Sequence, residues 1–285
     1  MLTKPNIPDE LIISRLQEEF DLRVAEFAFL PIGADSRTAV YRVFIDDGTA
    51  YFMKLRRKFN DIIIRVPLFL KENGVQEIII PYETKSSQHW ADFGEYKIIL
   101  YPFIDGKDGF ERELTDQHRR TLGEAFRKIH SAPLPPDLKE SIRKETFSTE
   151  WRDDMKSFQA QVEEKTFREP TAAKLAEFMK SRQKEIDHLV ERAEQLASDL
   201  QSKQLDFVLC HTDIHGGNIL IGNDDKLFIV DWDDPILAPK ERDLMFIGGG
   251  IDEIWKTKRE EMCFTKGMEV QRSISRLWHI TATNE

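Results

Sequence analysis

A polar loop followed by a single carboxylate is the part of the sequence whose residue types could do chemistry. The loop, HTDIHGGN, spans residues 211–218. Two short apolar runs around an Asn-Asp-Asp turn follow at 219–230 and predict a β-hairpin, and Asp231 comes directly after it. Because a hairpin brings its two outer ends together, we expect Asp213, Asn218 and Asp231 to lie close to one another.

This set of side chains is suited to phosphoryl transfer. The reaction needs a carboxylate that orients the attacking hydroxyl, oxygen ligands for Mg²⁺, and a cation on the phosphates. Asp213 is the predicted catalytic base. Asn218 and Asp231 are the predicted metal ligands, because Mg²⁺ prefers hard oxygen donors and takes few protein groups. Lys54, at the end of a predicted strand, is expected to reach the phosphates.

The first hundred residues are expected to form a small sheet with two helices. Residues 8–20 have apolar side chains at helical spacing and predict an amphipathic helix. Short apolar or alternating runs separated by tight turns then predict an antiparallel meander. The expected strands of the meander are 27–32, 39–45 and 50–55. A helix at 61–71 and strands at 77–81 and 96–104 complete a predicted five-stranded sheet.

Most of the remaining sequence has a helical pattern. Thr115 is the expected N-cap of a helix over 116–131, and prolines at 133–136 mark a linker. Residues 172–200 predict one long helix, in which a regular apolar stripe is interrupted only by Arg182.

The motif His211-x-Asp213-x₄-Asn218, followed by Ile-Val-Asp at 229–231, resembles the catalytic and metal motifs of the aminoglycoside phosphotransferase and choline kinase superfamily. The fuller string from His211 looks most like the spectinomycin phosphotransferase branch, and the resemblance spans about 27–250. It implies an α+β, protein-kinase-like bilobal fold. The N-terminal lobe, residues 1–104, would hold an antiparallel sheet with one main helix and bind the nucleotide. Residues 105–285 would form a mostly helical catalytic and substrate lobe.

The resemblance also implies further site residues. His211 would anchor the backbone of the catalytic loop. The turn from Gly33 to Ser36 would lie over the phosphates, and its backbone N–H groups would bind them. Tyr101 and Phe103 would belong to the hinge between the lobes, whose main chain binds adenine. In the family the strand lysine pairs with an acidic residue of the next helix; for Lys54 the sequence leaves Asp61 and Glu72 as alternatives.

Other polar and aromatic residues near the motif have a structural and a functional interpretation. We expect His215 to pack within the loop rather than to touch substrate. Asp233 and Asp234 are equally compatible with binding a cationic amine, helping to position the metal, or standing in solvent. An ion pair of Arg242 with Asp243 is expected to brace the site. Tryptophans can stack on a ring substrate, but we expect a core position instead for Trp151, Trp232 and Trp255.

The sequence therefore predicts an ATP- and Mg²⁺-dependent kinase that phosphorylates a hydroxyl group of a small molecule. An aminocyclitol or aminoglycoside antibiotic such as spectinomycin is the first acceptor hypothesis, with antibiotic resistance as the role. A second hypothesis keeps the mechanism and takes choline, a sugar or an amino alcohol as acceptor. A third is a nucleotide-binding pseudokinase or an inactive remnant.

Composition bounds the partners and the compartment. The chain has 41 Lys and Arg residues against 51 Asp and Glu, a formal net charge of −10. Non-specific nucleic-acid binding depends on neutralising phosphates, so we expect no nucleic-acid partner and a cationic small molecule instead. The two cysteines, Cys210 and Cys263, provide neither a disulfide framework nor paired metal-ligand spacing. With no signal core and no apolar run near the ~18 residues of a membrane span, we expect the protein in the cytoplasm. We expect it to be a monomer or weak dimer.

The C-terminal sequence, MEVQRSISRLWHITATNE, lacks the aromatic helix that the family has after its glycine-rich segment. Shifting the reading frame by one base allows a codon choice that yields YGSTKIDQPALAYYRYER, which is more similar to the family. This predicts a frameshifted or truncated product from about Gly267 onward. The coding DNA tests this hypothesis directly.

Overall fold

The computed structural model describes residues 3–33, 35–245, 247 and 257–268. The chain divides into two compact units, one of Met1–Arg143 with Val208–Glu285 and the other of Lys144–Phe207. Ala34, Trp255 and the stretch of the frameshift hypothesis from residue 269 lie outside the described residues. The first unit contains all the predicted site residues.

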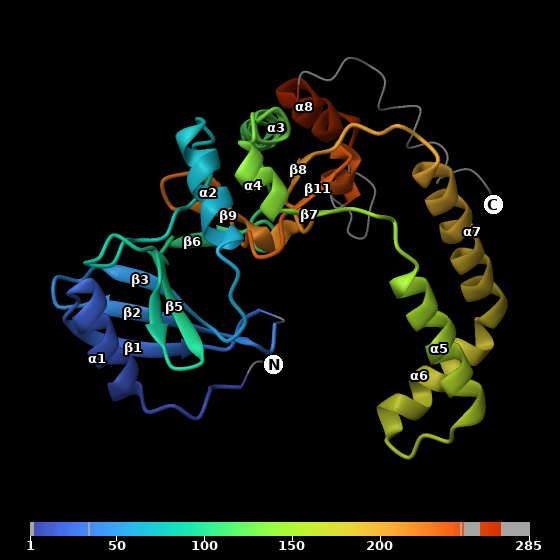
Figure 1. Cartoon of the computed structure of the whole chain (residues 1–285), viewed down its shortest axis with the longest axis horizontal. Helices are drawn as coiled ribbons and strands as arrows, with labels where there is room; N and C mark the ends of the chain where they lie inside the picture. The colour runs from blue at the N-terminus through green and yellow to red at the C-terminus, as the bar shows by residue number, and fades with distance from the viewer. Residues whose placement is uncertain (1–2, 34, 246, 248–256, 269–285) are drawn as a thin grey trace. The chain divides into compact units, whose positions relative to one another are not determined.

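A five-stranded sheet near the N-terminus has the order β1-β2-β3-β5-β4, and every neighbouring pair is antiparallel (Figure 1). Its strands are β1 (Val24–Leu30), β2 (Thr38–Ile45), β3 (Ala50–Arg56), β4 (Ala91–Phe93) and β5 (Tyr96–Pro102). The predicted meander of the first three strands is confirmed. The α+β class and the antiparallel N-terminal sheet are confirmed with it.

The strand predicted at 77–81 is wrong. That segment makes only an isolated parallel bridge, Ile78 with Ile229, and no ladder with the five-stranded sheet. The edge beside β5 is taken instead by β4, which is joined to β5 by a two-residue turn that begins at Gly94 (φ 58°). A local hairpin orders fewer intervening residues than a distant strand pairing, so β4 takes this edge.

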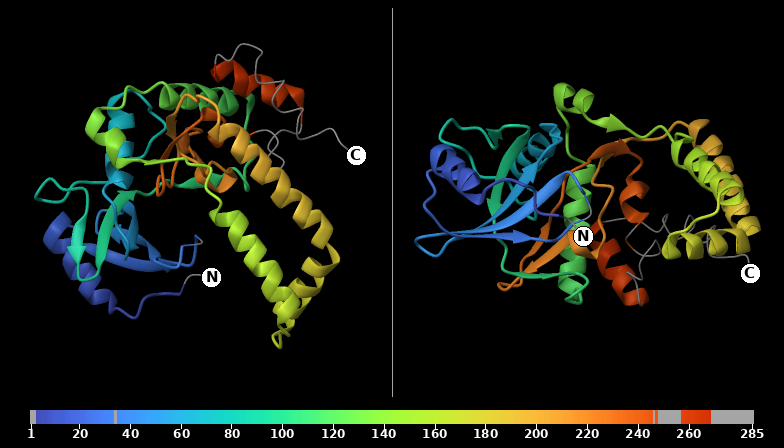
Figure 2. Two further views of the ribbon diagram at one scale, coloured as in Figure 1. Left: turned by 45° about the vertical axis from the view of Figure 1, so that its right-hand side comes forward. Right: turned by 90° about the horizontal axis from the view of Figure 1, so that it is seen from below.

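One face of the sheet is covered by helix α1 (Asp9–Phe20), as Figures 1 and 2 show. Ile12 and Leu16 of α1 are fully buried and pack with Met53 and Leu55 of β3 in one apolar cluster. Because side chains alternate along a strand, Lys54 and Arg56 project from the opposite face of β3. Helix α2 (Ile62–Glu72) follows β3, so the helices predicted at 8–20 and 61–71 are both present.

The predicted hairpin after the polar loop is confirmed: β9 (Ile219–Gly222) pairs antiparallel with β10 (Leu227–Ile229), and β6 (Gly106–Asp108) joins β9 on its other side. Thr115 caps helix α3 by accepting a hydrogen bond from His118 N at 3.1 Å, as the sequence predicted. Helix α3 spans Asp116–His130. The remaining elements of this unit are α4 (Pro136–Ser141), β7 (Arg143–Lys144), β8 (Val208–Cys210), η1 (Gly216–Asn218), β11 (Ile236–Ala238), η2 (Lys240–Met245) and α8 (Lys258–Met268).

The second unit consists of α5 (Glu150–Glu164), α6 (Pro170–Ser181) and α7 (Gln183–Gln201), with α5 and α7 side by side (Figures 1 and 2). The single helix predicted at 172–200 is therefore wrong. Arg182 leaves helical geometry (φ −113°, ψ 13°), and the Ser181 hydroxyl donates to Phe178 O at 2.7 Å. A serine that bonds back onto its own helix in this way bends the helix.

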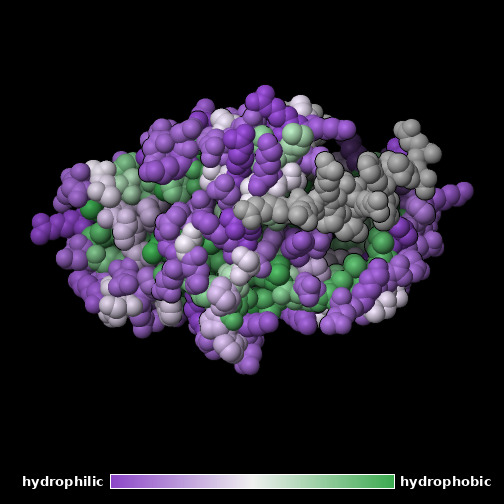
Figure 3. Space-filling view, turned by 90° about the horizontal axis from the view of Figure 1, so that it is seen from above, coloured by the Kyte–Doolittle hydropathy of each residue, from purple (hydrophilic) through white to green (hydrophobic). Residues whose placement is uncertain are grey.

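Hydrophilic residues cover much of the face drawn in Figure 3, with apolar residues gathered between them. Trp151 is 78% exposed, so its expected place in a core is wrong, whereas Trp232 is buried as expected. Exposed side chains are free of packing demands, which is why a tryptophan alone does not mark a core. None of the helices in the described part of the chain is both long and apolar enough to cross a membrane.

Candidate active site

The β9–β10 hairpin brings the ends of the polar loop and the following carboxylate together. Val230 N donates to Asn218 O at 3.0 Å, which joins the residue before β9 to the residue after β10. Asp225 takes a left-handed conformation (φ 66°) in the tight turn between the strands. Asn218 is therefore held beside the backbone that leads into Asp231, as the hairpin argument predicts.

The His211 ring links the start of the polar loop to the end of the hairpin. Its Nδ1 accepts from Asp213 N at 3.3 Å, and its Nε2 lies 2.8 Å from Val230 O. These contacts assign the ring proton to Nε2, which donates to the carbonyl. The ring is almost fully buried and packs edge-on against Trp232, with centroids 4.6 Å apart. His211 thus contacts loop backbone and not the open side of the site.

Asn218 and Asp213 are hydrogen-bonded to each other. Asn218 Nδ2 donates to Asp213 O at 2.6 Å and lies 3.4 Å from Asp213 Oδ2. The Asn218 side chain is buried, whereas the Asp213 side chain remains 55% exposed. With its NH₂ group committed to Asp213, Asn218 retains its amide oxygen as an acceptor. The Asp213 carboxylate is accessible to a ligand.

Two residues of the site have an unusual backbone conformation. Thr212 (φ 75°) and Asp231 (φ 66°) are both in the left-handed region although neither is glycine. Such residues persist where the surroundings fix them, and they cluster at functional sites. Thr212 N donates to Asp243 Oδ1 at 2.7 Å, and the fully buried Asp243 also contacts His130 Nε2 at 2.8 Å. Asp243 braces the loop through these contacts.

Lys54 reaches the hairpin from β3. Its Nζ lies 2.5 Å from Asp231 Oδ1 and 3.1 Å from Asp233 Oδ1, and its side chain is only 12% exposed. These are its acidic contacts among the described residues, so Lys54 pairs with neither Asp61 nor Glu72. The sequence left Asp61 and Glu72 as alternatives, and the structure places Asp231 and Asp233 beside Lys54 instead.

The ion pairs keep both charges in place. Burial alone would raise the pKa of Asp231, but the Lys54 ammonium outweighs it and holds that pKa below its ordinary value. Burial alone would lower the pKa of Lys54, but Asp233 and Asp231 raise it well above its usual range. Asp231 is therefore an anion and Lys54 a cation at neutral pH. The carboxylate of Asp231 and the amide oxygen of Asn218 are hard oxygen donors of the kind Mg²⁺ takes.

The turn predicted to lie over the phosphates connects β1 to β2. Gly33 is exposed with a left-handed φ of 88°, and Ser36 is exposed as well. Asp35 organises the turn by accepting from Arg37 N at 2.9 Å and from Thr38 Oγ1 at 2.8 Å. Burial raises the pKa of Asp35, but these hydrogen bonds outweigh it and lower that pKa.

The predicted hinge residues lie at the end of β5. Tyr101 pairs with Phe52 across the sheet, and burial raises the pKa of its phenol to about 12. Phe103 N donates to Ala50 O at 3.3 Å, and the Arg42 guanidinium lies 4.1 Å from the centre of the Phe103 ring. Both side chains are half-buried. This segment leaves the sheet just before β6, which pairs with β9 of the hairpin.

The remaining polar residues near the motif divide by their contacts. His215 stacks on Phe110 with ring centroids 5.7 Å apart and accepts from Gly217 N, which agrees with its expected packing role. Asp234 pairs with Arg143 at 2.7 Å on the surface. Asp233 instead bridges Lys54 and Arg56. Arg56 was not predicted from the sequence, although the Lys-x-Arg spacing on a strand puts both cations on one face.

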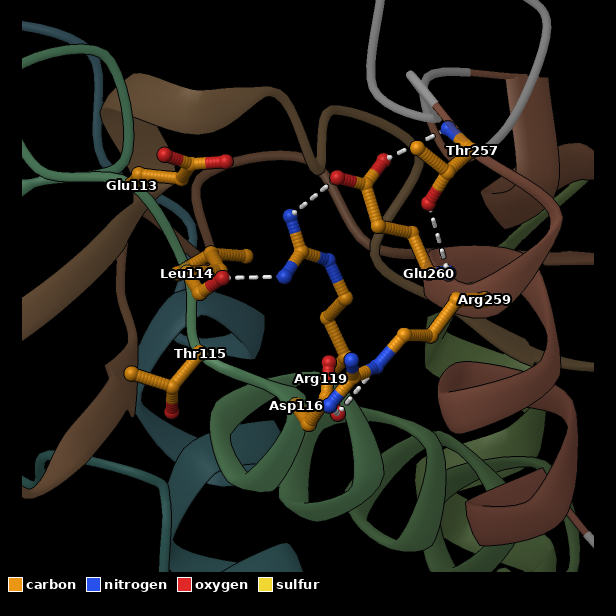
Figure 4. A pocket seen from close by; sticks show the side chains of 8 residues that line it. All are labelled: Glu113, Leu114, Thr115, Asp116, Arg119, Thr257, Arg259 and Glu260. Atoms are coloured by element: carbon orange, nitrogen blue, oxygen red, sulfur yellow. Dashed lines mark hydrogen bonds and ion pairs between the residues drawn. The ribbon is translucent and has the colours of Figure 1, made fainter.

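A separate pocket lies where α3 meets α8 (Figure 4). Four of the charged side chains that line it form two ion pairs: Arg119 pairs with Glu260 at 3.1 Å, and Arg259 pairs with Asp116 at 2.6 Å. The residues that line it are Glu113, Leu114, Thr115, Asp116, Arg119, Thr257, Arg259 and Glu260. None of them belongs to the predicted site, and the ion pairs give the pocket a structural role.

Comparison with known proteins gives one family. The sequence profile of the phosphotransferase enzyme family matches residues 29–249. Spectinomycin phosphotransferase APH(9)-Ia in complex with ADP and spectinomycin is 33% identical, with a TM-score of 0.88 over 94% of this chain and 82% of that one. Its AMP-bound complex is also 33% identical, with a TM-score of 0.83 over 94% and 83% of the two chains.

More distant structures share the fold alone. Choline kinase LicA from Streptococcus pneumoniae is 16% identical, with a TM-score of 0.56 over 95% of this chain and 85% of that one. No protein with a curated description matches the sequence. The likeness to the two APH(9)-Ia structures confirms the expected α+β, protein-kinase-like fold.

Proposed function

The chain belongs to the phosphotransferase enzyme family, and we propose that it transfers the γ-phosphoryl group of ATP to a hydroxyl of an aminocyclitol such as spectinomycin. The main support is the way the fold gathers four side chains: Lys54 pairs with Asp231, and Asn218 bonds Asp213. Val230, next to Asp231 in the chain, donates to Asn218 O and so joins the two pairs. The four side chains are the cation, oxygen ligands and base that phosphoryl transfer needs. The 33% identity to a complex with ADP and spectinomycin supports the nucleotide and the acceptor class.

Asp213 is the proposed base. Its exposed carboxylate can accept a hydrogen bond from the acceptor hydroxyl and take its proton as the oxygen attacks the γ-phosphorus. A new oxygen–phosphorus bond forms, and the bond between the γ-phosphorus and the β,γ-bridging oxygen breaks to release ADP. His211 keeps Asp213 in position through its contacts with Asp213 N and Val230 O.

Asn218 and Asp231 are the proposed Mg²⁺ ligands, and their oxygen donors fit that ion. Bound there, Mg²⁺ would neutralise charge on the phosphate oxygens. Asp231 is kept ionised by Lys54, so it is ready to bind a cation. Lys54 is the proposed phosphate ligand from β3.

The adenine and phosphate contacts complete the proposed nucleotide site. Gly33 and Ser36 would bind phosphate oxygens through the backbone of the β1–β2 turn. Tyr101 and Phe103 would present main-chain groups to adenine. On this proposal residues 1–104 form the nucleotide-binding lobe and residues 105–285 the catalytic and acceptor lobe.

The net charge of −10 supports a cationic acceptor. A cationic aminocyclitol would be drawn to an acidic surface, whereas a polyanion such as nucleic acid would be repelled. We place the enzyme in the cytoplasm, where ATP is available, as a monomer or weak dimer. Antibiotic resistance is the role that follows from a spectinomycin acceptor.

An acceptor screen tests the proposal. ADP release from MgATP is measured with spectinomycin, other aminocyclitols, aminoglycosides, choline and simple sugars, with Asp213→Asn as the matched inactive variant. The proposal expects acceptor-dependent release with an aminocyclitol. ADP release with choline alone would change the proposed acceptor class. If no acceptor in the panel stimulates ADP release, the proposal is contradicted. Growth on spectinomycin with and without the gene tests the resistance role.

A further inference from the structure

Two cations project from the same face of β3. Lys54 and Arg56 are two residues apart, and their side chains are only 12% and 10% exposed. In the sheet Arg56 is opposite Thr38, the first residue of β2. Thr38 comes directly after the β1–β2 turn, so Arg56 lies beside the end of that turn. No part of the mechanism above uses Arg56.

A single carboxylate bridges the two cations. Asp233 directs Oδ1 toward Lys54 Nζ at 3.1 Å and Oδ2 toward Arg56 Nη1 in an ion pair. Arg56 Nη2 is also 3.9 Å from Asp35 Oδ2 in the β1–β2 turn. Asp233 thus presents two anionic oxygens to a lysine and an arginine at once, which is how a phosphate group is bound.

The Arg56 guanidinium has donors left over. It carries five N–H groups in a rigid fork and cannot be deprotonated. Among the described residues its Nε has no hydrogen-bond partner, although the side chain is nine-tenths buried. A buried donor without a partner is unfavourable, and a ligand with several oxygens would satisfy it. Phosphate oxygens have the geometry that this fork binds best.

We propose that Arg56 is a second ligand of the nucleotide phosphates beside Lys54, and that Asp233 holds both cations until phosphate oxygens replace its carboxylate. The inference rests on the proposed ATP-dependent function and deepens it. Arg56 thereby links the phosphates to Asp35 and so to the turn above them. Asp233, two residues after the proposed metal ligand Asp231, is released when nucleotide binds.

Nucleotide binding without Mg²⁺ tests the role of Arg56, because the metal then contributes nothing. Calorimetry gives the dissociation constants of ATP, ADP and adenosine for the wild type, Arg56→Gln and Arg56→Lys. Arg56→Gln is expected to weaken ATP and ADP binding about 10- to 100-fold, the range for a hydrogen-bonded charge. Adenosine affinity should stay the same, and Arg56→Lys should recover part of the loss.

Arg57→Gln is the matched control. Arg57 follows Arg56 directly, but its side chain is exposed and pairs with the exposed Glu95 at 2.8 Å. Its loss removes the same charge from the chain and should leave all three dissociation constants unchanged. Thermal melting of every variant checks that the fold is retained.

Asp233→Asn tests the exchange. Removing this carboxylate should tighten ATP binding, because phosphate no longer competes with it for the two cations. The gain should shrink in the double variant with Arg56→Gln, since one of the two competing contacts is then absent. Such coupling between neighbouring residues is what a double-mutant cycle measures.

Different results would overturn the role of Arg56, the exchange with Asp233 and the proposed function. Unchanged ATP affinity in Arg56→Gln, or an equal loss for adenosine, would show a purely structural brace and overturn the inference while leaving the kinase proposal intact. Weaker ATP binding by Asp233→Asn would reject the exchange. A wild type that binds neither ATP nor ADP, with Mg²⁺ as well as without it, would remove the proposed function and this inference together.

Discussion

Asp213 and Asp231 are held by different groups, and the difference gives them different chemistry. Asp231 lies in a left-handed backbone conformation with Lys54 2.5 Å from its carboxylate, which keeps it ionised. The Asp213 carboxylate is more than half exposed, and the contacts to its Oδ2 are long: Asn218 Nδ2 lies 3.4 Å away and His215 Nε2 3.7 Å away. Asp213 is therefore free to bond a hydroxyl, while Asp231 is arranged to bind cations.

Asp213→Asn should abolish most turnover without affecting binding. The amide keeps the shape of the side chain but cannot take the hydroxyl proton, and one positioned base contributes roughly 10²- to 10⁴-fold in rate. Steady-state ADP release gives kcat, and calorimetry gives the ADP dissociation constant, which should not change. Turnover within a few-fold of the wild type would remove Asp213 from the role of base.

The sequence predicted part of the site at this scale. Asp213, Asn218 and Asp231 could be grouped because one hairpin controls their separation, and a hairpin is visible in a local pattern. The partner of Lys54 could not be predicted, because it depends on how β3 faces a segment 177 residues further along the chain. Arg56 was missed for the same reason: its partner Asp233 is equally distant in sequence.

At the scale of elements, the β1–β2 turn is organised by Asp35. Hydrogen bonds from Arg37 N and Thr38 Oγ1 shape the turn that is proposed to cover the phosphates. Because the folded state lowers the Asp35 pKa, the ionised side chain stabilises the fold.

That stabilisation has a defined pH dependence. Since the Asp35 pKa is depressed below its ordinary value of 3.8, the stabilisation is fully present above that value and is lost as pH falls through the folded-state pKa. Urea unfolding should show Asp35→Asn less stable than the wild type at pH 7. The difference in unfolding free energy between the two proteins should narrow as pH falls from about 4 to the lowest pH at which the chain still folds. A difference in unfolding free energy that does not change with pH would contradict the stabilising role of the ionised Asp35.

Helices α3 and α8 approach closely at a pair of glycines. A Cβ on Gly123 would lie 2.2 Å from Phe264 O and 3.1 Å from Gly267 Cα. Alanine is a better helix former than glycine by about 1 kcal/mol, but the backbone contact leaves no room for its methyl group.

Gly123→Ala should therefore lower stability, by about 1–3 kcal/mol, the usual cost of overpacking. The neighbouring Glu124→Ala, at an exposed position of the same helix, is the control and should change stability little. Urea unfolding of both variants measures this. A Gly123→Ala variant as stable as the wild type would show that α8 does not pack on α3 in this way.

Local patterns predicted elements well where the determinant was local. The Thr115 cap, the meander and the β9–β10 hairpin all follow from residues within a few positions of each other. The errors arose where the determinant lay elsewhere. Residues 77–81 have strand composition, but β4 took the sheet edge, and the apolar stripe of 172–200 concealed the bend at Ser181 and Arg182.

At the scale of the whole molecule, nucleotide binding should stabilise the folded chain. A ligand at about 100 times its dissociation constant adds about 2.7 kcal/mol to the unfolding free energy. MgADP should therefore raise the melting temperature of the wild type above the value with ADP alone. In Asp231→Asn the increment from Mg²⁺ should disappear, while that from ADP alone remains. An undiminished Mg²⁺ increment in this variant would mean that Asp231 does not bind the metal.

Transfer of phosphate to an acceptor hydroxyl leaves a phosphate ester on the acceptor, so identification of the product tests whether the reaction takes place. The purified full chain is incubated with MgATP and spectinomycin, and mass spectrometry with phosphorus NMR examines the acceptor. We expect an aminocyclitol carrying one phosphate ester, formed by the wild type and absent with Asp213→Asn. ATP consumed with no phosphorylated acceptor, or the same product yield from both proteins, would contradict it.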